Sequence, residues 1–287
     1  IPSMSRSRFL AFCLVLARVF KGLDDSRNLG ILLPPSVAGA AANMACFMRA
    51  KTVVNLNFTT GPLVMEACMD AAQVTTVVTS TQFVNKLKAK GFPIEESLAS
   101  RKVIYLEEVR DSISSRTKLL AGLAARFLPV FLLRLMYCCK SNVSDTAAIL
   151  FSSGSEGAPK GVIFSHANIV GNCRQVAEVF NPAEDDVVLG SLPLFHAFGL
   201  TATSLMPLIQ GMDLACWPDP TDAAGLGKMV AEHEATILCA TPTFLGLYAR
   251  NKRLHPLMFK SLRLVVAGAE KLPQEVRKRF KDKFTLE

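Results

Sequence analysis

The chain has few aromatic residues that carry a polar group, with one Trp and three Tyr among its 287 residues. Proteins that bind single-stranded nucleic acid commonly interleave aromatic and basic side chains, so that bases stack between the charges. This sequence has no such stretch, although 32 basic and 24 acidic residues leave a net charge of +8. We therefore expect no nucleic-acid partner. The charge favours smaller anions: nucleotides, acidic carrier proteins and anionic lipid headgroups.

Metal-site and disulfide patterns are also missing from the sequence. The eight Cys include no C-x-x-C pair, and the four His do not combine with them in a zinc-binding spacing. Most of the Cys lie within apolar runs, which is typical of small buried thiols in a reducing compartment. We therefore assign no metal-ligating residue.

An apolar segment near the start superficially resembles a secretory signal, because residues 9–17 are apolar and follow Arg6 and Arg8. However, Arg18 and Lys21 come next, and no cleavage site of small residues follows them. We therefore predict an amphipathic core helix here.

Basic residues gather at positions 277–283, which is typical of a solvated helix face. The chain starts with Ile1 and stops at Glu287, directly after this helical pattern. We therefore expect it to be a fragment of a longer protein.

A second apolar stretch, residues 123–139, contains Arg126, Pro129 and Arg134. It is too short and too charged to cross the roughly 30 Å hydrocarbon core of a bilayer as a helix. Two interpretations remain. The stretch lies on a membrane surface with its arginines at the headgroups, or it is a connector packed against the core.

Short apolar runs alternate with helical patterns, which indicates an α/β fold with parallel sheets covered on both faces. The predicted strands are 29–33, 52–56, 74–79, 103–106, 147–151, 162–164, 187–192, 213–217, 235–240 and 262–267. Helices are predicted at 37–49, 62–72 and 166–180, the last capped by Ser165, and Gly211 suits a helix end. The polar stretch 140–145 predicts a boundary between two α/β lobes, 1–140 and 141–287.

Residues 151–161 (FSSGSEGAPKG) are the most informative segment, because they follow an apolar strand and combine three Ser with three Gly. Glycines let the backbone approach a ligand, successive N–H groups form a concave anion site, and Lys160 adds a positive charge. These are the parts needed to hold the β- and γ-phosphates of ATP. The loop is neither a Walker A motif, since Pro159 precedes the lysine, nor a G-x-S-x-G nucleophile elbow. Composition alone would favour a flexible surface loop, but the preceding strand and the lysine behind proline argue against it.

The loop resembles the signature loop of the AMP-forming adenylate synthetases, the superfamily of acyl-CoA synthetases, luciferases and peptide-synthetase adenylation domains. The resemblance implies a truncated N-terminal domain of two parallel-sheet lobes that uses ATP and Mg²⁺. It implies nucleotide binding by Ser152, Ser153, Gly154, Ser155, Glu156 and Gly157, with Lys160 as a catalytic residue. Ser152 and Glu156 stand where threonine is usual. Ser152 keeps the hydroxyl, whereas Glu156 places a negative charge beside the phosphates.

Three further motifs follow in the order of that superfamily. Residues 192–200 (LPLFHAFGL) resemble the motif that borders the acyl pocket, 240–245 (ATPTFL) a turn lining the same cleft, and 265–272 (VVAGAEKL) the adenine-binding turn. The resemblance implies the following roles: catalytic His196; substrate-binding Phe195, Phe198 and Thr241; and nucleotide-binding Gly268, Ala269 and Glu270. Read alone, His196 would be an interior histidine and the last motif an ordinary strand-end turn.

Within the superfamily, this combination resembles the synthetase part of the bacterial bifunctional acyl-acyl-carrier-protein synthetase/lysophospholipid acyltransferase. It implies a fatty acid substrate, acyl carrier protein as acceptor, and a place at the cytoplasmic side of the inner membrane with its anionic surface. The attachment would be peripheral or through domains absent from this chain; otherwise we expect a cytoplasmic protein. No His is followed by Asp five positions on, so the acyltransferase is not encoded. The Tyr-Gly-x-Thr-Glu segment of the superfamily is also missing, and we expect little or no turnover from this stretch alone.

The resemblance implies that a fatty carboxylate attacks the α-phosphorus of ATP, expels pyrophosphate, and then passes as an acyl group to a thiol. Two alternatives stay open. One is an acyl-CoA or other carboxylate–CoA ligase of the same superfamily. The other is a non-catalytic homologue that binds a nucleotide or an acyl group.

Overall fold

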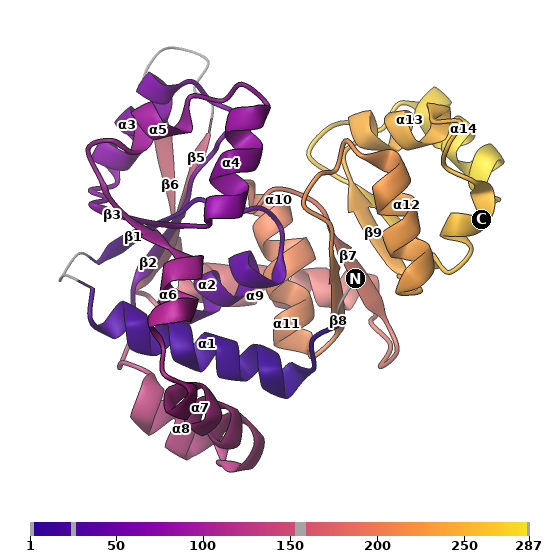
Figure 1. Cartoon of the computed structure of the whole chain (residues 1–287). Helices are drawn as coiled ribbons and strands as arrows, with labels where there is room; N and C mark the ends of the chain where they lie inside the picture. The colour runs from indigo at the N-terminus through magenta and orange to yellow at the C-terminus, as the bar shows by residue number, and fades with distance from the viewer. Residues whose placement is uncertain (1–2, 24–26, 153–158, 286–287) are drawn as a thin grey trace. The chain divides into compact units, whose positions relative to one another are not determined.

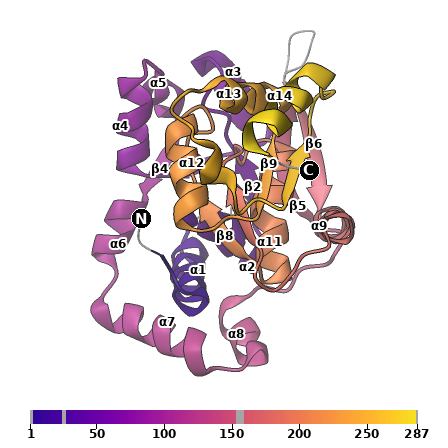
Figure 2. The ribbon, with the colours of Figure 1, turned by 90° about the vertical axis from the view of Figure 1, so that its right-hand side faces the viewer.

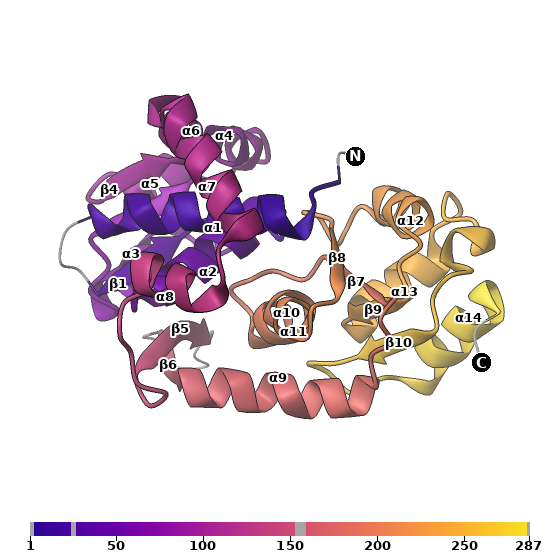
Figure 3. The same cartoon turned by 90° about the horizontal axis from the view of Figure 1, so that it is seen from below.

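The computed structural model describes residues 3–23, 27–152 and 159–285, which form two compact units (Figure 1). The first unit comprises Ile1–Leu33 and Val37–Ile169, and the second comprises Pro34–Ser36 and Val170–Glu287. The division falls inside α9 (His166–Phe180), which is one continuous helix (Figure 3).

The first unit contains a six-stranded sheet with the order β4-β3-β1-β2-β5-β6. Its strands are β1 (Asn28–Ile31), β2 (Thr52–Asn55), β3 (Thr76–Thr79), β4 (Lys102–Tyr105), β5 (Thr146–Ser152) and β6 (Lys160–Ser165). The first five strands pair in parallel, whereas β6 runs antiparallel to β5. Every residue of β2 and β3 is buried, which explains the paired valines at the centre of each strand; the residues at the strand ends, Thr52, Asn55, Thr76 and Thr79, are buried polar residues.

Helices of the first unit cover this sheet, and α1 contacts both α2 and α7. Their bounds are α1 (Arg6–Lys21), α2 (Val37–Met48), α3 (Pro62–Ala71), α4 (Thr81–Ala89), α5 (Ile94–Leu98), α6 (Leu106–Ser112), α7 (Ser115–Phe127) and α8 (Val130–Tyr137). Helix α1 buries Leu14, Leu16 and Phe20, so the expected amphipathic core helix is confirmed. Within the described ranges, no helix combines the length and apolar character that crossing a bilayer requires.

The lobe boundary differs from the one placed at residues 140 and 141 from the sequence. Strand β5 follows that polar stretch but pairs with β2, with Val53 opposite Ala148 and Val54 opposite Ile149. This pairing, with that of β5 and β6, assigns both strands to the first sheet. A polar stretch shows that a connection is exposed, but it does not show which sheet the next strand joins.

The second unit contains a fully parallel four-stranded sheet with the order β10-β9-β7-β8. Its strands are β7 (Val187–Gly190), β8 (Asp213–Cys216), β9 (Ile237–Ala240) and β10 (Leu264–Ala267). Its helices are α10 (Ala197–Leu200), the π-helix η1 (Thr201–Leu205), α11 (Met206–Gln210), α12 (Ala223–Glu232), α13 (Pro242–Arg250), the 3₁₀ helix η2 (Pro256–Phe259) and α14 (Gln274–Phe284). The parallel α/β fold expected from the sequence is therefore confirmed, with β6 as its antiparallel exception.

Two local predictions about helix ends are also confirmed. The backbone N–H of Asn168 donates to the Ser165 hydroxyl at 3.1 Å, so Ser165 caps α9 as expected. Gly211 ends α11 in the left-handed region, with φ of 73°. Both residues are recognisable in a sequence because their roles are local.

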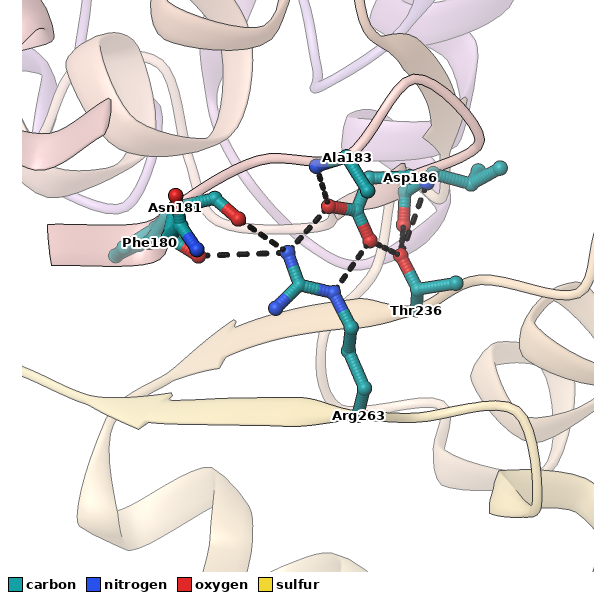
Figure 4. Close-up of polar contacts among 7 residues, drawn as sticks. Phe180, Asn181, Ala183, Asp186, Thr236 and Arg263 are labelled. Carbon is teal, nitrogen blue, oxygen red and sulfur yellow. Dashed lines mark hydrogen bonds and ion pairs between the residues drawn. The ribbon is translucent and has the colours of Figure 1, made fainter. Parts of the chain in front are cut away.

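An ionic cluster joins the amino ends of three strands in the second unit (Figure 4). Asp186 lies just before β7, Thr236 before β9 and Arg263 before β10. The Thr236 hydroxyl donates to Asp186 at 2.6 Å, and the Arg263 guanidinium donates to the carbonyls of Phe180 and Asn181 at 3.3 and 3.2 Å. The cluster fixes the edge of the sheet opposite to the strand ends at which the predicted motifs lie.

Candidate functional site

The candidate phosphate loop follows β5 and precedes β6 in the sequence, and these two strands are antiparallel neighbours in the first unit. Ser152 lies opposite Lys160 in the register, and both side chains are exposed. The register therefore brings a hydroxyl and an ammonium group to the two ends of the loop. The other predicted members of the loop lie outside the described residues: Ser153, Gly154, Ser155, Glu156 and Gly157.

Gly161 lets the two strands of this hairpin pack closely. A Cβ at this position would lie 3.1 Å from the Phe151 ring and 3.2 Å from Ile149, both on the facing strand. The glycine thus accommodates the Phe151 ring opposite it, and this contact helps to hold the position of Lys160, the preceding residue.

The remaining predicted residues follow the carboxyl ends of β7, β9 and β10 in the second unit. Ala240 and Ala267 are register partners at the ends of β9 and β10, and the Gly268 N–H donates to the Ala240 carbonyl at 3.1 Å. In the first turn of α13, the Thr243 hydroxyl donates a hydrogen bond to the Glu270 carboxylate at 3.2 Å. Ligands of open parallel α/β sheets characteristically bind at this edge.

The turn after β10 is shaped by its small residues. A Cβ on Gly268 would lie 2.7 Å from the Phe198 ring, so the ring rests directly against this glycine. Ala269 has φ of 70°, a left-handed conformation that is uncommon for a residue with a side chain. Ala269 and Glu270 are both exposed. The turn therefore presents backbone groups to solvent beside an aromatic ring.

Thr241 occupies the first position after β9 and caps α13. Its hydroxyl oxygen accepts a hydrogen bond from the Phe244 N–H at 3.4 Å. A hydroxyl that accepts one bond can still donate its own proton. Thr241 can therefore contact a ligand while it caps the helix.

His196 lies in the loop after β7, directly before α10. Its ring centroid is 4.6 Å from that of the buried Phe195. Partial desolvation lowers the pKa of the His196 imidazole below its ordinary value of 6.5. The residue is nevertheless exposed, so a ligand can reach it, and the lowered pKa favours the neutral imidazole at pH 7.

Gly199 holds the backbone of this loop. A Cβ there would overlap the carbonyl oxygen of Pro193 and would lie 2.9 Å from that of Leu192. The His196 N–H donates to the same Pro193 carbonyl at 3.2 Å. The position of His196 therefore depends on a close approach that only glycine permits.

Three buried polar atoms near the end of β7 were not recognised from the sequence. Ser191 and Ser204 are 1% and 3% exposed, and neither their hydroxyls nor the Trp217 indole N–H has a hydrogen-bond partner in the described part of the chain. Ser191 follows Gly190, whose carbonyl accepts from the Trp217 backbone N–H at 2.9 Å. Ser204 follows Thr203, whose carbonyl oxygen lies 2.9 Å from where a Cβ on Gly190 would be. No motif marks these residues, because only the fold brings them close together.

The structure thus places one group of predicted residues in each unit. Ser152 and Lys160 belong to the first unit, at the ends of the hairpin loop. His196, Phe198, Thr241 and Gly268 belong to the carboxyl edge of the second sheet, together with their neighbours Phe195, Ala269 and Glu270. Because each group is defined within its own unit, its geometry can be tested on its own.

These features define a parallel α/β protein whose candidate ligand-binding residues follow the carboxyl ends of its strands. The chain belongs to the AMP-binding enzyme family, which matches it over residues 3–286.

Two curated relatives illustrate this membership. The 4-coumarate–CoA ligase 2 of Solanum tuberosum is 26% identical over 269 residues, which cover 92% of this chain and 46% of the relative. The long-chain-fatty-acid–CoA ligase of Escherichia coli O157:H7 is 24% identical over 281 residues, which cover 90% of this chain and 49% of the relative. The chain therefore spans about half the length of the curated relatives it matches.

Solved structures share the fold. ATP-bound MatB from Rhodopseudomonas palustris has a TM-score of 0.72 at 20% identity, and the match covers 96% of this chain and 52% of that one. The O-succinylbenzoate coenzyme A synthetase MenE from Bacillus subtilis, in complex with AMP, has a TM-score of 0.72 at 18% identity, with 96% of this chain and 63% of that one covered. At these identities the likeness establishes the fold.

Proposed function

We propose that the protein containing this chain activates a carboxylic acid, with a fatty acid as the substrate class, by forming an acyl-adenylate from ATP. The observation that carries this proposal is the gathering of three motifs at the carboxyl edge of β7, β9 and β10 in a member of the AMP-binding enzyme family. The ATP-bound and AMP-bound solved structures of the same fold support a nucleotide as the ligand.

In the proposed reaction, a carboxylate oxygen attacks the α-phosphorus of ATP, and the bond from that phosphorus to pyrophosphate breaks. Lys160, with Ser152 and the loop between them, would hold the pyrophosphate that leaves. The exposed backbone of Gly268, Ala269 and Glu270 fits the edge of a planar base. The protein contributes placement and charge stabilisation, and no side chain forms a covalent bond.

His196 would border the reacting carboxylate together with Phe195, Phe198 and Thr241. Because its lowered pKa keeps the imidazole neutral at pH 7, His196 can donate one hydrogen bond without forming a fixed ion pair with the acid. In the second step a thiolate attacks the acyl carbonyl carbon, the bond to AMP breaks, and AMP leaves with its phosphate oxygen.

Magnesium would neutralise the phosphates of ATP in this reaction. Among residues 3–23, 27–152 and 159–285, no three His, Cys, Asp or Glu side chains are grouped in a way that could hold a metal ion. We therefore assign no ligand to Mg²⁺ and route no step through it.

Two thiol acceptors compete in this proposal. Acyl carrier protein is the acceptor implied by the motif combination, and we propose it with peripheral attachment to the cytoplasmic side of the inner membrane. Coenzyme A is the second candidate, because both curated relatives described above are named as CoA ligases. A non-catalytic binding role is the third alternative.

The test measures ATP–pyrophosphate exchange by the full-length protein with a series of fatty acids and with 4-coumarate. Exchange that depends on a fatty acid supports adenylation, and its absence with every acid supports the non-catalytic role. Thioester formation is then measured with acyl carrier protein and with coenzyme A in separate reactions. A product with coenzyme A alone would replace the carrier-protein assignment while leaving the adenylation step intact.

A further inference from the structure

Helices α7 and α8 form a hairpin around Pro129 on the outer side of α1 (Figures 1 and 2). Helix α7 is buried only through small residues, and α8 through a single leucine. Ala121 and Ala124 of α7 and Leu133 of α8 are buried, and they pack in one cluster with Leu14 of α1. The buried side chains of α7 are therefore the methyl groups of these two alanines.

The large apolar side chains of the hairpin face solvent instead. The exposed fractions are 63% for Leu119, 61% for Leu120, 45% for Leu123, 73% for Phe127, 70% for Val130, 67% for Phe131, 79% for Leu135 and 60% for Met136. Leu119, Leu123 and Phe127 repeat every four residues, so they form one stripe along α7. A surface helix normally turns such a stripe toward the core, and a large exposed apolar patch marks an interaction site.

The same segment has charge of one sign. Residues 112–144 contain five basic residues and no acidic residue: Arg116, Lys118, Arg126, Arg134 and Lys140. All five side chains are exposed. Helix α6, which precedes the segment, carries Glu107 and Glu108 in its first turn. Asp111 and Asp145 bound the segment, so the basic residues without an acidic neighbour in sequence are those of the hairpin itself.

We propose that the α7–α8 hairpin docks the protein on an anionic bilayer surface, with the eight apolar side chains in the headgroup region and the basic residues against lipid phosphates. Helices with basic residues beside exposed Phe and Leu bind in the plane of such an interface. Helix α7 has 13 residues and is therefore about 20 Å long, which suits lying on a bilayer rather than crossing it.

The charge distinguishes a bilayer from a second copy of the chain. Two hairpins packed face to face would bring together the five basic residues of each copy and no acidic partner from 112–144. An anionic lipid surface instead supplies the opposite charge at the rim and an apolar layer at the centre. This inference does not depend on which acid the protein activates.

The experiment is flotation of the full-length protein with vesicles of phosphatidylcholine alone, or of phosphatidylcholine and phosphatidylglycerol in equal parts. Binding is expected to the anionic vesicles and to weaken with added salt. The double variant Phe127→Ser with Phe131→Ser should lose at least about tenfold in partitioning. For the double variant Arg126→Gln with Arg134→Gln, partitioning onto anionic vesicles should fall about fivefold for each charge removed.

Matched controls change equally exposed residues elsewhere. Leu63→Ser with Val179→Ser removes side chains that are 79% and 80% exposed on α3 and α9, and Arg277→Gln with Lys278→Gln removes two exposed charges from α14. Both controls should partition as the parent does, and circular dichroism should show all variants folded. The proposal is overturned if the parent ignores anionic vesicles, or if the hairpin variants partition as the controls do. It is also overturned if the parent sediments as a dimer, the hairpin variants sediment as monomers, and their partitioning onto vesicles is unchanged.

Discussion

Asp186 and Arg263 form a two-bond ion pair at the amino ends of β7 and β10. The Arg263 Nε donates to Asp186 Oδ1 at 2.7 Å, and its Nη2 donates to Oδ2. Asp186 is 1% exposed, whereas Arg263 is 40% exposed. The Arg263 guanidinium, with help from Thr236 and the Ala183 N–H, lowers the pKa of the Asp186 carboxyl to about 2.

Because the pKa of Asp186 is lowered in the folded state, the free energy of unfolding of the second unit depends on pH. The carboxylate contributes fully above its unfolded pKa of about 3.9, and the contribution is lost as pH falls toward the folded pKa. We expect Asp186→Asn to lower the free energy of unfolding by about 2 kcal/mol at pH 7. The difference from the parent should shrink between pH 4 and pH 2, as measured by urea denaturation.

Glu275→Gln is the matched control for the Asp186 pair. Glu275 pairs with Arg279 on α14, and the two side chains are 79% and 47% exposed. Exposed pairs contribute less than about 1 kcal/mol. Equal losses in the two variants at pH 7 would contradict the special role of the buried carboxylate.

Gly199→Ala should disturb the loop that carries His196. The added methyl group overlaps the Pro193 carbonyl, and the neighbour that must move is backbone. We expect a loss of about 1–3 kcal/mol in unfolding free energy and a fall in ATP–pyrophosphate exchange. Gly171→Ala on α9 has open space around its new methyl group and should instead stabilise by up to about 1 kcal/mol. A destabilised Gly171→Ala or an unchanged Gly199→Ala would contradict this account.

Thr203 and Ser204 are adjacent buried hydroxyls with opposite expectations. Thr203 donates to the Gly199 carbonyl at 2.8 Å, whereas Ser204 has no partner within the described residues. Thr203→Val should cost about 1 kcal/mol in stability, and Ser204→Ala should be neutral or stabilising. Thermal unfolding compares the two variants. If Ser204→Ala is destabilised as strongly as Thr203→Val, its hydroxyl has a partner, such as a buried water molecule.

Gly268→Ala should hinder nucleotide binding by displacing Phe198. The new methyl group would lie 2.7 Å from the ring, and we expect the KM for ATP to rise about tenfold, equal to about 1.4 kcal/mol. Because Phe198→Leu shortens the opposing side chain, the double variant should recover much of the loss. Additive effects of the two substitutions would show that the residues act independently.

Lys160→Ala tests the hairpin loop in the full-length protein. Loss of the positive charge should slow ATP–pyrophosphate exchange far more than it weakens binding of the fatty acid, because the charge acts on phosphate groups. Lys278→Ala removes an exposed charge from α14 and serves as the control. Equal exchange rates in Lys160→Ala and the parent would remove Lys160 from its assigned role.

The sequence predicts most of the local structure because strands and helix caps leave local signals. The runs 187–192 and 262–267 contain β7 (Val187–Gly190) and β10 (Leu264–Ala267) at their observed positions. The apolar residues of β7 are explained by burial in a parallel sheet, since three of its four residues are buried, whereas all four residues of β10 are half-buried. Strand pairing is different, because it depends on partners distant in the chain. The pairing of β5 with β2, which determines where the first unit ends and the second begins, could not be predicted from the polar stretch at 140–145.

Sequence motifs identified the residues around the carboxyl edge of the second sheet, but not their contacts. The contact of Phe198 with Gly268 joins residues 70 positions apart, and no local pattern predicts it. Ser191 and Ser204 were missed for a related reason. A serine in an apolar run looks the same whether or not its hydroxyl finds a partner, and only the packed structure distinguishes the two cases.

The α7–α8 hairpin is followed closely by an exposed thiol that can carry a reporter group, that of Cys139. Cys139 lies two residues beyond α8 and is exposed, while Cys13, Cys46, Cys68, Cys173 and Cys239 are buried and Cys138 and Cys216 are half-buried. Its backbone N–H donates to the Met48 carbonyl at 2.8 Å, which anchors it to the first unit. A maleimide dye should therefore react with Cys139 first. A shift in the emission wavelength of the dye would then report, in real time, when the end of the α7–α8 hairpin moves from water into a less polar environment.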